Sequence, residues 1–196
     1  MKKMHYLVIT PFFPSNDNFR GPYVLDQVKA ITKRSNYEVT VLKPKSFFSK
    51  LQDYQFDGVV VYYFIRIVLP SNILPGLFNR LNKYLFFKKL NYLGIKLNSI
   101  EVAHAHVTEN GFYANILKAK QPKIKSVLQH HGFDVLSLEN GKLRHSLWHR
   151  KWVKNYGVSI SNKIDLHLGV SKKTLSCVSA SFRSILQNHY GPFLIT

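Results

Sequence analysis

The sequence predicts an α/β fold with a doubly wound, mostly parallel sheet that carries helices on both faces. The main observation is alternation. Short apolar runs rich in β-branched and aromatic residues alternate with segments of helical periodicity along the whole chain, a pattern typical of βαβ units. The composition agrees, because 45% of the 196 residues are hydrophobic, which is enough for a packed core and argues against disorder.

The expected strands are short and are bounded by turn residues. The first, at residues 5–10, is followed by Pro11 and Pro14, as is typical of a buried parallel strand. The remaining strands are expected at residues 38–42, 58–69, 101–107, 125–130 and 166–170.

The expected helices lie between these strands. In residues 24–34 the apolar side chains recur at helical spacing, and Lys33 and Arg34 suit the negative C-terminal end of the helix dipole. Further helices are expected at residues 76–97, 111–120 and 142–155, and another opens at residues 172–178.

Charge is the most unusual property of the composition. The chain has 28 Lys and Arg against 10 Asp and Glu, for a net charge of +18. This imbalance indicates an anionic partner, which can be nucleic acid, anionic lipid headgroups or a phosphorylated substrate.

The sequence also indicates a cytoplasmic protein. No apolar run approaches the roughly 20 residues that span a bilayer. The apolar stretch near the start, residues 7–9, is too short for a secretory signal. The single cysteine, Cys177, cannot form an internal disulfide, as expected in a reducing compartment.

A loop at residues 11–21 joins the first strand to its helix. Free backbone N–H groups at a helix N-terminus suit a phosphate, Gly21 permits close approach, and Pro22 is favourable at the helix start. The loop has neither the GxGxxG nor the GxxxxGK[ST] pattern. The alternative interpretation is therefore an ordinary connection in which Gly21 only makes the turn.

Histidines end two of the expected strands. Alternation places His104 and His106 on one face, but two histidines without further ligands do not define a metal site, so no metal is expected. His131, Gly132 and Asp134 follow the next strand. There a neutral imidazole can donate to a sugar hydroxyl or a phosphate and a carboxylate can accept; the alternative is a turn with an Asx-type hydrogen bond.

All of these motifs lie at carboxyl ends of strands, where doubly wound sheets bind their ligands. Gly132 and Ser171 are further candidate binding residues at these ends. The default role of Ser171 is to cap the following helix, and contact with a ligand would be additional.

The helix at residues 76–97 combines an apolar stripe of Leu and Phe with Arg80, Lys83, Lys88 and Lys89. A basic, aromatic-bearing amphipathic helix is typical of membrane-surface contact. The alternative is a core-facing helix with a solvated charged face. The net charge favours contact with an anionic membrane surface through these four residues.

Five segments, in order and spacing, resemble one known family. They are ITPFFPS, RGPYVLDQVKAITKRSNYEVTVL, EVAHAHVTENGFYA, SVLQHHGFDV and IDLHLGVSKKT. Together they resemble the Rossmann-like N-terminal, acceptor-side domain of family 4 glycosyltransferases, the retaining GT-B group. The resemblance covers about residues 4–178.

The resemblance implies transfer of a sugar, with retention and without a metal or other cofactor, from a nucleotide-sugar donor to a glycan or lipid-linked acceptor. By this resemblance Gly21 would approach the donor diphosphate. His131 would lie by the donor sugar and the reaction centre, and Asp134 would shape that pocket. His106 and Glu109 would face the acceptor. The corresponding half of family members often touches the inner membrane, in agreement with the basic helix.

The family's second Rossmann domain, which holds the nucleotide, has no counterpart in this sequence. Residues 179–196 match the family poorly. The expectation is therefore an acceptor-side domain at residues 1–178 followed by a tail, a truncated or separated half that is inactive alone. A separate donor-binding half is an expected partner.

Two other functions remain open. One is a nucleic-acid-binding domain, since +18 suits a phosphate backbone. However, no RRM, HTH, KH or zinc-finger pattern is present and the basic residues are dispersed, so no nucleic-acid partner is expected. The other is a membrane-attached adaptor without catalysis.

Overall fold

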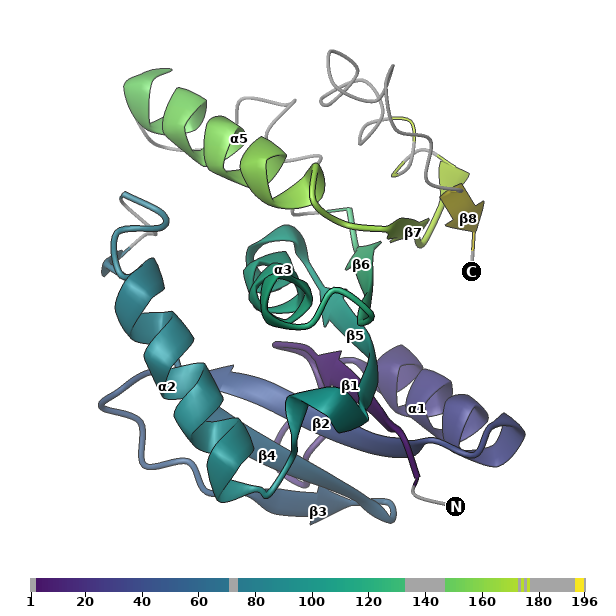
Figure 1. Ribbon diagram of the computed structural model, residues 1–196. Helices are drawn as coiled ribbons and strands as arrows, with labels where there is room; N and C mark the ends of the chain where they lie inside the picture. The colour runs from purple at the N-terminus through teal and green to yellow at the C-terminus, as the bar shows by residue number, and fades with distance from the viewer. Residues whose placement is uncertain are drawn as a thin grey trace.

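A computed structural model of the protein describes residues 3–70, 74–132, 147–172, 174, 176 and 193–195 (Figure 1). In these residues one eight-stranded sheet has the order β3-β4-β2-β1-β5-β6-β7-β8. The strands are β1 (His5–Ile9), β2 (Glu38–Lys45), β3 (Tyr54–Phe56), β4 (Val59–Ile65), β5 (Ile100–His106), β6 (Lys125–His130), β7 (Leu166–Gly169) and β8 (Phe193–Ile195). All neighbours pair in parallel except the antiparallel pair β3 and β4.

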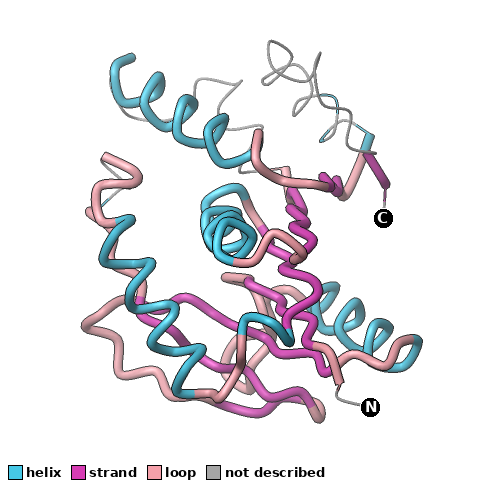
Figure 2. Tube along the Cα trace, in the orientation of Figure 1, coloured by secondary structure: helices cyan, strands magenta, loops and turns pink. Residues whose placement is uncertain are grey.

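Helices cover both faces of this sheet. The helices of the described residues are α1 (Pro22–Arg34), α2 (Asn79–Tyr92), α3 (Gly111–Lys120) and α5 (Leu147–Ser161), with 3-10 turns at Leu97–Ser99 and Thr108–Asn110. α1 lies on one side of the sheet, whereas α2 and α3 lie on the other (Figures 1 and 2). The predicted α/β, doubly wound, mostly parallel architecture is confirmed.

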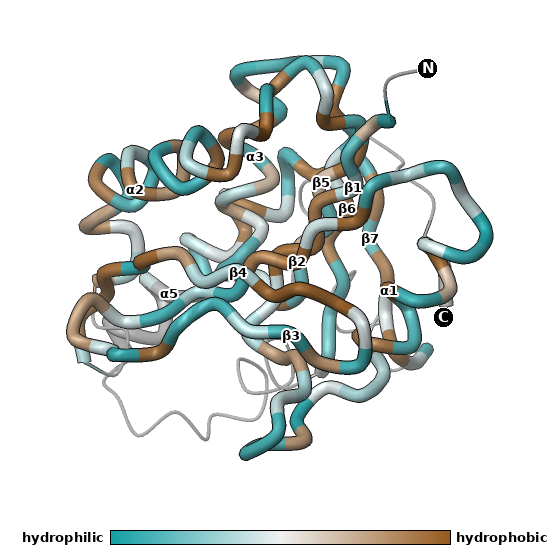
Figure 3. Tube along the Cα trace, turned by 90° about the horizontal axis from the view of Figure 1, so that it is seen from below, coloured by the Kyte–Doolittle hydropathy of each residue, from teal (hydrophilic) through white to brown (hydrophobic). Residues whose placement is uncertain are grey.

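Successive side chains of β1 point to opposite faces of the sheet, and both faces are covered. This explains why the sequence of β1 is a continuous apolar run. Val8 packs with α1 and the valines of β2 and β4, while Leu7 and Ile9 pack on the other face with Phe86 and Tyr113. Both faces of the strand are therefore buried, as in parallel sheets covered by helices. In Figure 3 hydrophobic stretches follow the central strands and hydrophilic stretches gather in the outer loops.

The expected strand at residues 58–69 is wrong in extent, and β3 was not predicted. β3 and β4 form a hairpin whose turn is Asp57-Gly58, with φ of 49° and 79°. Positive φ at both central residues is what a two-residue type I′ turn requires, and Asp-Gly favours it. β4 ends at Ile65, so Arg66 begins the segment beyond its carboxyl end.

The expected helix at residues 76–97 is also too long, since α2 covers Asn79–Tyr92. Residues 142–146 of the expected helix 142–155 lie outside the described residues, as does most of the tail at residues 179–196. Within that tail, Phe193–Ile195 pairs in parallel with β7 as β8. This part of the tail therefore belongs to the sheet.

The order β4-β2-β1-β5-β6-β7 places β1 and β5 side by side, and the chain winds outward from them in opposite directions. In doubly wound sheets this reversal opens a crevice at the carboxyl ends of the two central strands. The residues after Ile9 and after His106 therefore lie where a ligand is expected.

Candidate functional site

The loop after β1 packs closely on itself. The Thr10 hydroxyl donates to the Phe12 carbonyl at 2.9 Å and accepts from the Phe12 amide at 3.1 Å, which turns the chain at the end of the strand. Gly21 has φ 79°, and a Cβ there would lie 2.8 Å from the Cβ of Phe12. A glycine is thus required by the backbone and by Phe12. This favours the interpretation of Gly21 as a turn residue; its approach to a diphosphate stays a prediction.

Three imidazoles line up at the carboxyl ends of β5 and β6, and we call His104, His106 and His131 the histidine column. The rings of His104 and His106 stack with centroids 4.6 Å apart, and those of His106 and His131 with centroids 5.2 Å apart. Nδ1 of His106 lies 2.9 Å from Nε2 of His131. At the inner end of the column, the Tyr6 hydroxyl lies 2.9 Å from Nδ1 of His104.

Burial keeps the inner part of the column uncharged. His104 and His106 are fully buried. Burial is the main cause that lowers the pKa of His104 to about 4. It also holds the pKa of His106 well below its ordinary value, assisted by the neighbouring His104 and His131. Both rings are therefore neutral near pH 7. His106 lies behind His131, away from the surface at which the resemblance would place an acceptor.

His131 forms the outer end of the column and is half-buried. The Phe12 ring contacts it edge-on at 6.1 Å, and the Tyr23 ring lies 5.0 Å away at an interplanar angle of 35°. Phe12 comes from the loop after β1 and Tyr23 from the first turn of α1, so the two motifs of the sequence meet here. Gly132, with φ 92°, allows the sharp turn after His131. Asp134 lies outside the described residues.

A residue with a strained backbone directly follows β5. Val107 has φ 63°, an outlier for a β-branched side chain. Its amide donates to the Gln129 carbonyl at 2.9 Å, and its carbonyl accepts from the Asn110 amide at 3.0 Å. The Asn110 side chain also donates to the His106 carbonyl at 3.1 Å. Such strain persists only where the surroundings enforce it, and it is common at functional sites. Sequence reasoning did not identify Val107.

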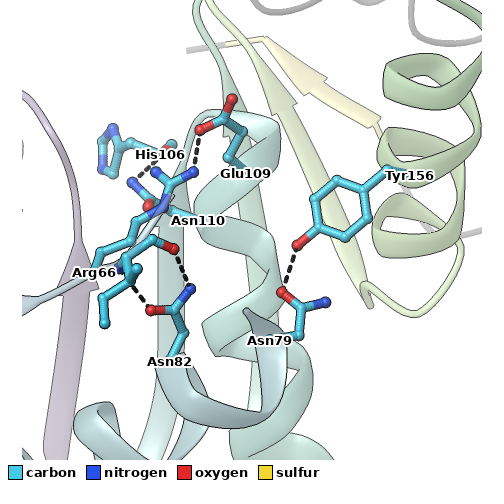
Figure 4. Close-up of polar contacts among 8 residues, drawn as sticks. Arg66, Asn79, Asn82, His106, Glu109, Asn110 and Tyr156 are labelled. Atoms are coloured by element: carbon cyan, nitrogen blue, oxygen red, sulfur yellow. Dashed lines mark hydrogen bonds and ion pairs between the residues drawn. The ribbon is translucent and has the colours of Figure 1, made fainter. Parts of the chain in front are cut away.

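A cleft opens beside these residues at the ends of β4 and β5, between α2 and α5 (Figure 4). Its polar centre is an ion pair between Arg66 and Glu109. On the α5 side, the Tyr156 hydroxyl donates to Oδ1 of Asn79 at 3.0 Å. Glu109 follows the carboxyl end of β5; its contact with an acceptor stays a prediction. Sequence reasoning missed Arg66, although it follows a strand as the other candidates do.

The cleft wall is fixed to α2 by a buried amide. Asn82 accepts from the Ile67 amide at 2.7 Å and donates to the Ile67 carbonyl at 2.8 Å (Figure 4). These two hydrogen bonds satisfy the backbone N–H and C=O groups of Ile67, which lies beyond the end of β4 and has no strand partner there. Arg66, next to Ile67, is thereby held over the cleft.

Ser171 caps the turn after β7. Its hydroxyl accepts from the Thr174 amide at 3.1 Å, the contact expected of an N-cap residue. The capping role is confirmed. Contact with a ligand stays a prediction.

The basic residues of α2 have unlike surroundings. Arg80 and Lys88 are exposed and Lys83 is half-buried. Lys89 is bound to Asp53 at 2.7 Å and lies over the rings of two tyrosines, Tyr62 and Tyr92. Lys89 therefore secures α2 to the sheet.

The described residues contain neither a membrane-spanning helix nor a metal-binding group. None of their helices is long and apolar enough to cross a bilayer. Nor do any three His, Cys, Asp or Glu side chains among them gather into a group that could hold a metal ion.

No protein-family model matches the sequence, and no curated protein has a significantly similar sequence. Solved structures do match. Sucrose-phosphate synthase from Thermosynechococcus elongatus aligns over 97% of this chain and 48% of its own, with a TM-score of 0.65 and 9% identity. UGT71G1 of Medicago truncatula, complexed with UDP-glucose, aligns over 98% of this chain and 51% of its own, with a TM-score of 0.51 and 9% identity.

The apo structure of OtsA also aligns, over 94% of this chain and 43% of its own, with a TM-score of 0.52 and 10% identity. This chain thus spans about half the length of the first of these proteins. All three are GT-B glycosyltransferases. At such low identity the likeness establishes the fold, a Rossmann-like domain of the GT-B kind.

Proposed function

We propose that this chain is the acceptor-side domain of a retaining GT-B glycosyltransferase similar to family 4. The reaction transfers a sugar from a nucleotide-sugar donor to a glycan or lipid-linked acceptor, as in polysaccharide biosynthesis. The observation that carries the proposal is the histidine column, whose half-buried outer ring, His131, lies beside the switch point of the sheet.

His131 is the residue proposed to act on the donor. A neutral imidazole can donate one hydrogen bond to a hydroxyl or phosphate oxygen of the donor. A bond donated to a phosphate oxygen of the donor tightens as negative charge develops on the leaving diphosphate, so it lowers the barrier without strengthening ground-state binding. One such contact contributes roughly 2–4 kcal/mol. The rings of Phe12 and Tyr23 lie beside His131 and give it an apolar surrounding on that side.

The acceptor is proposed to enter through the cleft at Arg66 and Glu109. Glu109 follows His106 by three residues, so the cleft and the histidine column both lie at the carboxyl end of β5. A carboxylate can accept hydrogen bonds from acceptor hydroxyls, and the Arg66 guanidinium fixes its orientation. Asp134, Gly132 and Ser171 remain proposed contributors to the donor pocket.

The donor half of the site is proposed to come from a second domain, on the same or another chain. UGT71G1, which is twice as long as the aligned region, was solved with UDP-glucose. By the resemblance to family 4, most donor contacts are proposed to lie in that second domain. The proposal requires no metal or other cofactor, and the proposed location is the cytoplasm, peripheral on the inner face of the membrane.

An NMR titration tests the proposal on the chain as it exists. UDP-glucose and a GDP-sugar are added to the isotope-labelled protein. Weak binding is expected, with shifts confined to the loop at Gly21 and to His131 and Gly132. Micromolar affinity for either nucleotide sugar would contradict the proposal that most of the donor site lies in a second domain. Chemical-shift changes at other residues would contradict the proposed position of the donor at His131.

The alternative is a basic membrane- or nucleic-acid-binding domain without catalysis, which the net charge of +18 favours. It predicts no response of His131 to any nucleotide sugar. Salt-dependent binding of duplex DNA at physiological ionic strength would then support the nucleic-acid form of this alternative.

A further inference from the structure

The cleft between α2 and α5 has an inner and an outer part. The hydrogen bond from Tyr156 to Asn79 lies between them, because these two residues line both parts (Figure 4). The inner part holds the ion pair of Arg66 and Glu109. The outer part, which we call the outer pocket, is lined by residues 75–77 and Asn79 and by Trp152, Asn155, Tyr156 and Ser159 of α5. Its volume is about 720 Å³, within the range of small-ligand sites.

Two aromatic side chains of α5 fix the walls of the outer pocket. Trp152 and Tyr156 stand four residues apart on the helix, so they share one face. The Trp152 indole N–H donates to the Pro75 carbonyl at 3.2 Å. A Cβ at Gly76, which has φ 91°, would lie 2.8 Å from Cε2 of Tyr156. The segment before α2 therefore lies directly against both aromatic residues, and the pocket is held open between fixed walls.

The described residues that line the outer pocket carry no charge. This is unusual in a chain of 196 residues with 28 Lys and Arg. The basic side chains nearest in sequence, Arg80 and Lys154, are exposed and lie outside this lining. The described walls therefore give a phosphate or a carboxylate no counter-charge, although the net charge of the chain attracts anions in general.

In the inner part of the cleft, the carboxylate is the more exposed charge. The Arg66 side chain is 18% exposed and is paired with Glu109, whose side chain is 41% exposed. A carboxylate accepts hydrogen bonds from hydroxyl groups and repels phosphate. Both parts of the cleft therefore favour an uncharged ligand that carries hydroxyl groups.

The polar and aromatic groups of the outer pocket are of the kind that a sugar needs. Trp152 is 41% exposed, and its indole can cover the face of a pyranose ring that presents C–H groups. Asn155 and Ser159 are exposed beside it. An amide both donates and accepts hydrogen bonds, as sugar hydroxyls do. A hydrocarbon chain would instead bury these polar groups without partners, at a cost.

We propose that the outer pocket binds one uncharged sugar unit of the acceptor, with a pyranose face against Trp152 and hydroxyl groups on Asn155 and Ser159. The acceptor is then a glycan whose bound unit carries neither phosphate nor carboxylate. This inference rests on the acceptor cleft of the proposed function and names the substrate class of that cleft. It assigns Trp152 to holding the acceptor and not to the transfer step.

Fluorine NMR on the complete chain tests the inference. The chain has two tryptophans, so labelling with 5-fluorotryptophan gives two signals, and Trp148→Phe assigns the one from Trp152. The probes are the methyl glycosides of glucose, galactose, mannose and N-acetylglucosamine. At least one should shift the Trp152 signal with a millimolar dissociation constant. Absence of a response at Trp152 to all four would overturn the inference.

The charge preference is tested with two derivatives of the methyl glycoside that binds. Its 6-phosphate should bind at least about tenfold more weakly, the equivalent of 1.4 kcal/mol, despite the net charge of +18. Its 6-O-methyl ether adds bulk without charge and should bind more tightly than the 6-phosphate. A 6-phosphate that binds as tightly as either uncharged compound would overturn the assignment of an uncharged sugar.

Two substitutions at Trp152 separate stacking from structural support. Trp152→Phe and Trp152→Leu both lose the hydrogen bond to Pro75, but only the first keeps an aromatic ring. Binding is measured on the sugar by saturation-transfer NMR, and Trp152→Phe should bind about fivefold more tightly than Trp152→Leu. Equal dissociation constants for the two variants would contradict stacking on residue 152.

A neighbouring pair on α5 tests the amide. Asn155→Ala should weaken sugar binding by about fivefold, because it removes one hydrogen bond. Lys154→Ala changes an exposed residue outside the lining and should leave the dissociation constant unchanged. Equal effects of these two changes would contradict a sugar at Asn155.

The nucleotide-sugar titration is followed at His131 and the methyl glycosides at Trp152, so the two outcomes are distinguishable. A response at Trp152 alone would retain the sugar in the outer pocket and count against the donor site. A response at His131 alone would retain the donor site and overturn the inference about the outer pocket.

Discussion

Nδ1 of His106 lies 2.9 Å from Nε2 of His131, and the planes of the two rings are 12° apart. A hydrogen bond between two neutral imidazoles needs one N–H donor and one bare nitrogen acceptor. The tautomers of His106 and His131 are therefore coupled. The buried ring behind the candidate catalytic residue determines which nitrogen of that residue carries its proton.

The first prediction follows from this coupling. His106→Leu removes the partner of Nε2, so His131 should populate both tautomers, where the unaltered protein shows mainly one. Nitrogen-15 chemical shifts of the imidazoles at neutral pH measure this. His5→Gln at the start of β1 serves as the control and should leave the His131 signals unchanged. Identical His131 signals in the protein and in His106→Leu would refute the coupling.

The second prediction compares two adjacent histidines in a chain joined to a donor-binding domain. His131→Ala should lower kcat by about 30- to 1000-fold, the equivalent of roughly 2–4 kcal/mol, with little change in Tm. His130 is fully buried, and its Nε2 lies 3.1 Å from Nδ1 of His167. His130→Ala should therefore lower Tm by several degrees and leave kcat of the folded enzyme nearly unchanged.

Steady-state kinetics and thermal unfolding measure the two effects. The reverse pattern would contradict the assignment, and so would a stable His131→Ala enzyme with near-normal turnover.

The third prediction concerns acid. Burial lowers the pKa of His104, and burial with the neighbouring His130 lowers that of His167, each from 6.5 to about 4. Between these values the unfolded chain binds more protons than the folded protein, so stability falls as the pH falls through this window. Each of these histidines can lower the free energy of unfolding by at most roughly 3 kcal/mol.

Urea unfolding at pH values from 7 down to 4 measures this loss. His104 and His167 together cause part of the loss in unfolding free energy between pH 7 and pH 4. His167→Gln should remove about half of that part. A slope in His167→Gln equal to that of the parent would contradict the role of this histidine.

The fourth prediction tests why residue 21 is a glycine. Gly21→Ala adds a Cβ that meets Phe12 at 2.8 Å in a backbone with φ 79°, whereas Gly94→Ala has a φ of 70° and nothing within 4 Å. Both variants incur the cost of positive φ, about 1 kcal/mol. Gly21→Ala should be destabilised by a further 1 kcal/mol or more, because the loop must move. Equal unfolding free energies of the two variants would show that Phe12 gives way freely.

Local sequence patterns were sufficient to predict most elements of the fold. The apolar run of β1, the helical spacing of α1 and the strands that end in histidines all follow from periodicity, which depends only on neighbouring residues. The Asp57-Gly58 turn carried the same kind of signal and was overlooked, so β3 was missing from the prediction. The role of Ser171 as a cap is equally local and was predicted.

The arrangement of the site depended on contacts between distant segments. His106 and His131 lie 25 residues apart, and alternation along β5 could not show that one would lie behind the other. Arg66 meets Glu109 from 43 residues away, and Lys89 meets Asp53 from 36 residues away. Nothing in the helix itself distinguishes Lys89 from Arg80 and Lys83, for which no ion pair is found within the described residues.

The sequence by itself therefore determined the alternating elements, the parallel sheet and the edge at which polar residues gather, because hydrophobic period and turn chemistry are properties of short segments. Only the tertiary structure decided which rings stack and which charges pair. Those outcomes depend on strand order and helix packing, which bring together residues whose separation in sequence carries no signal of their contact.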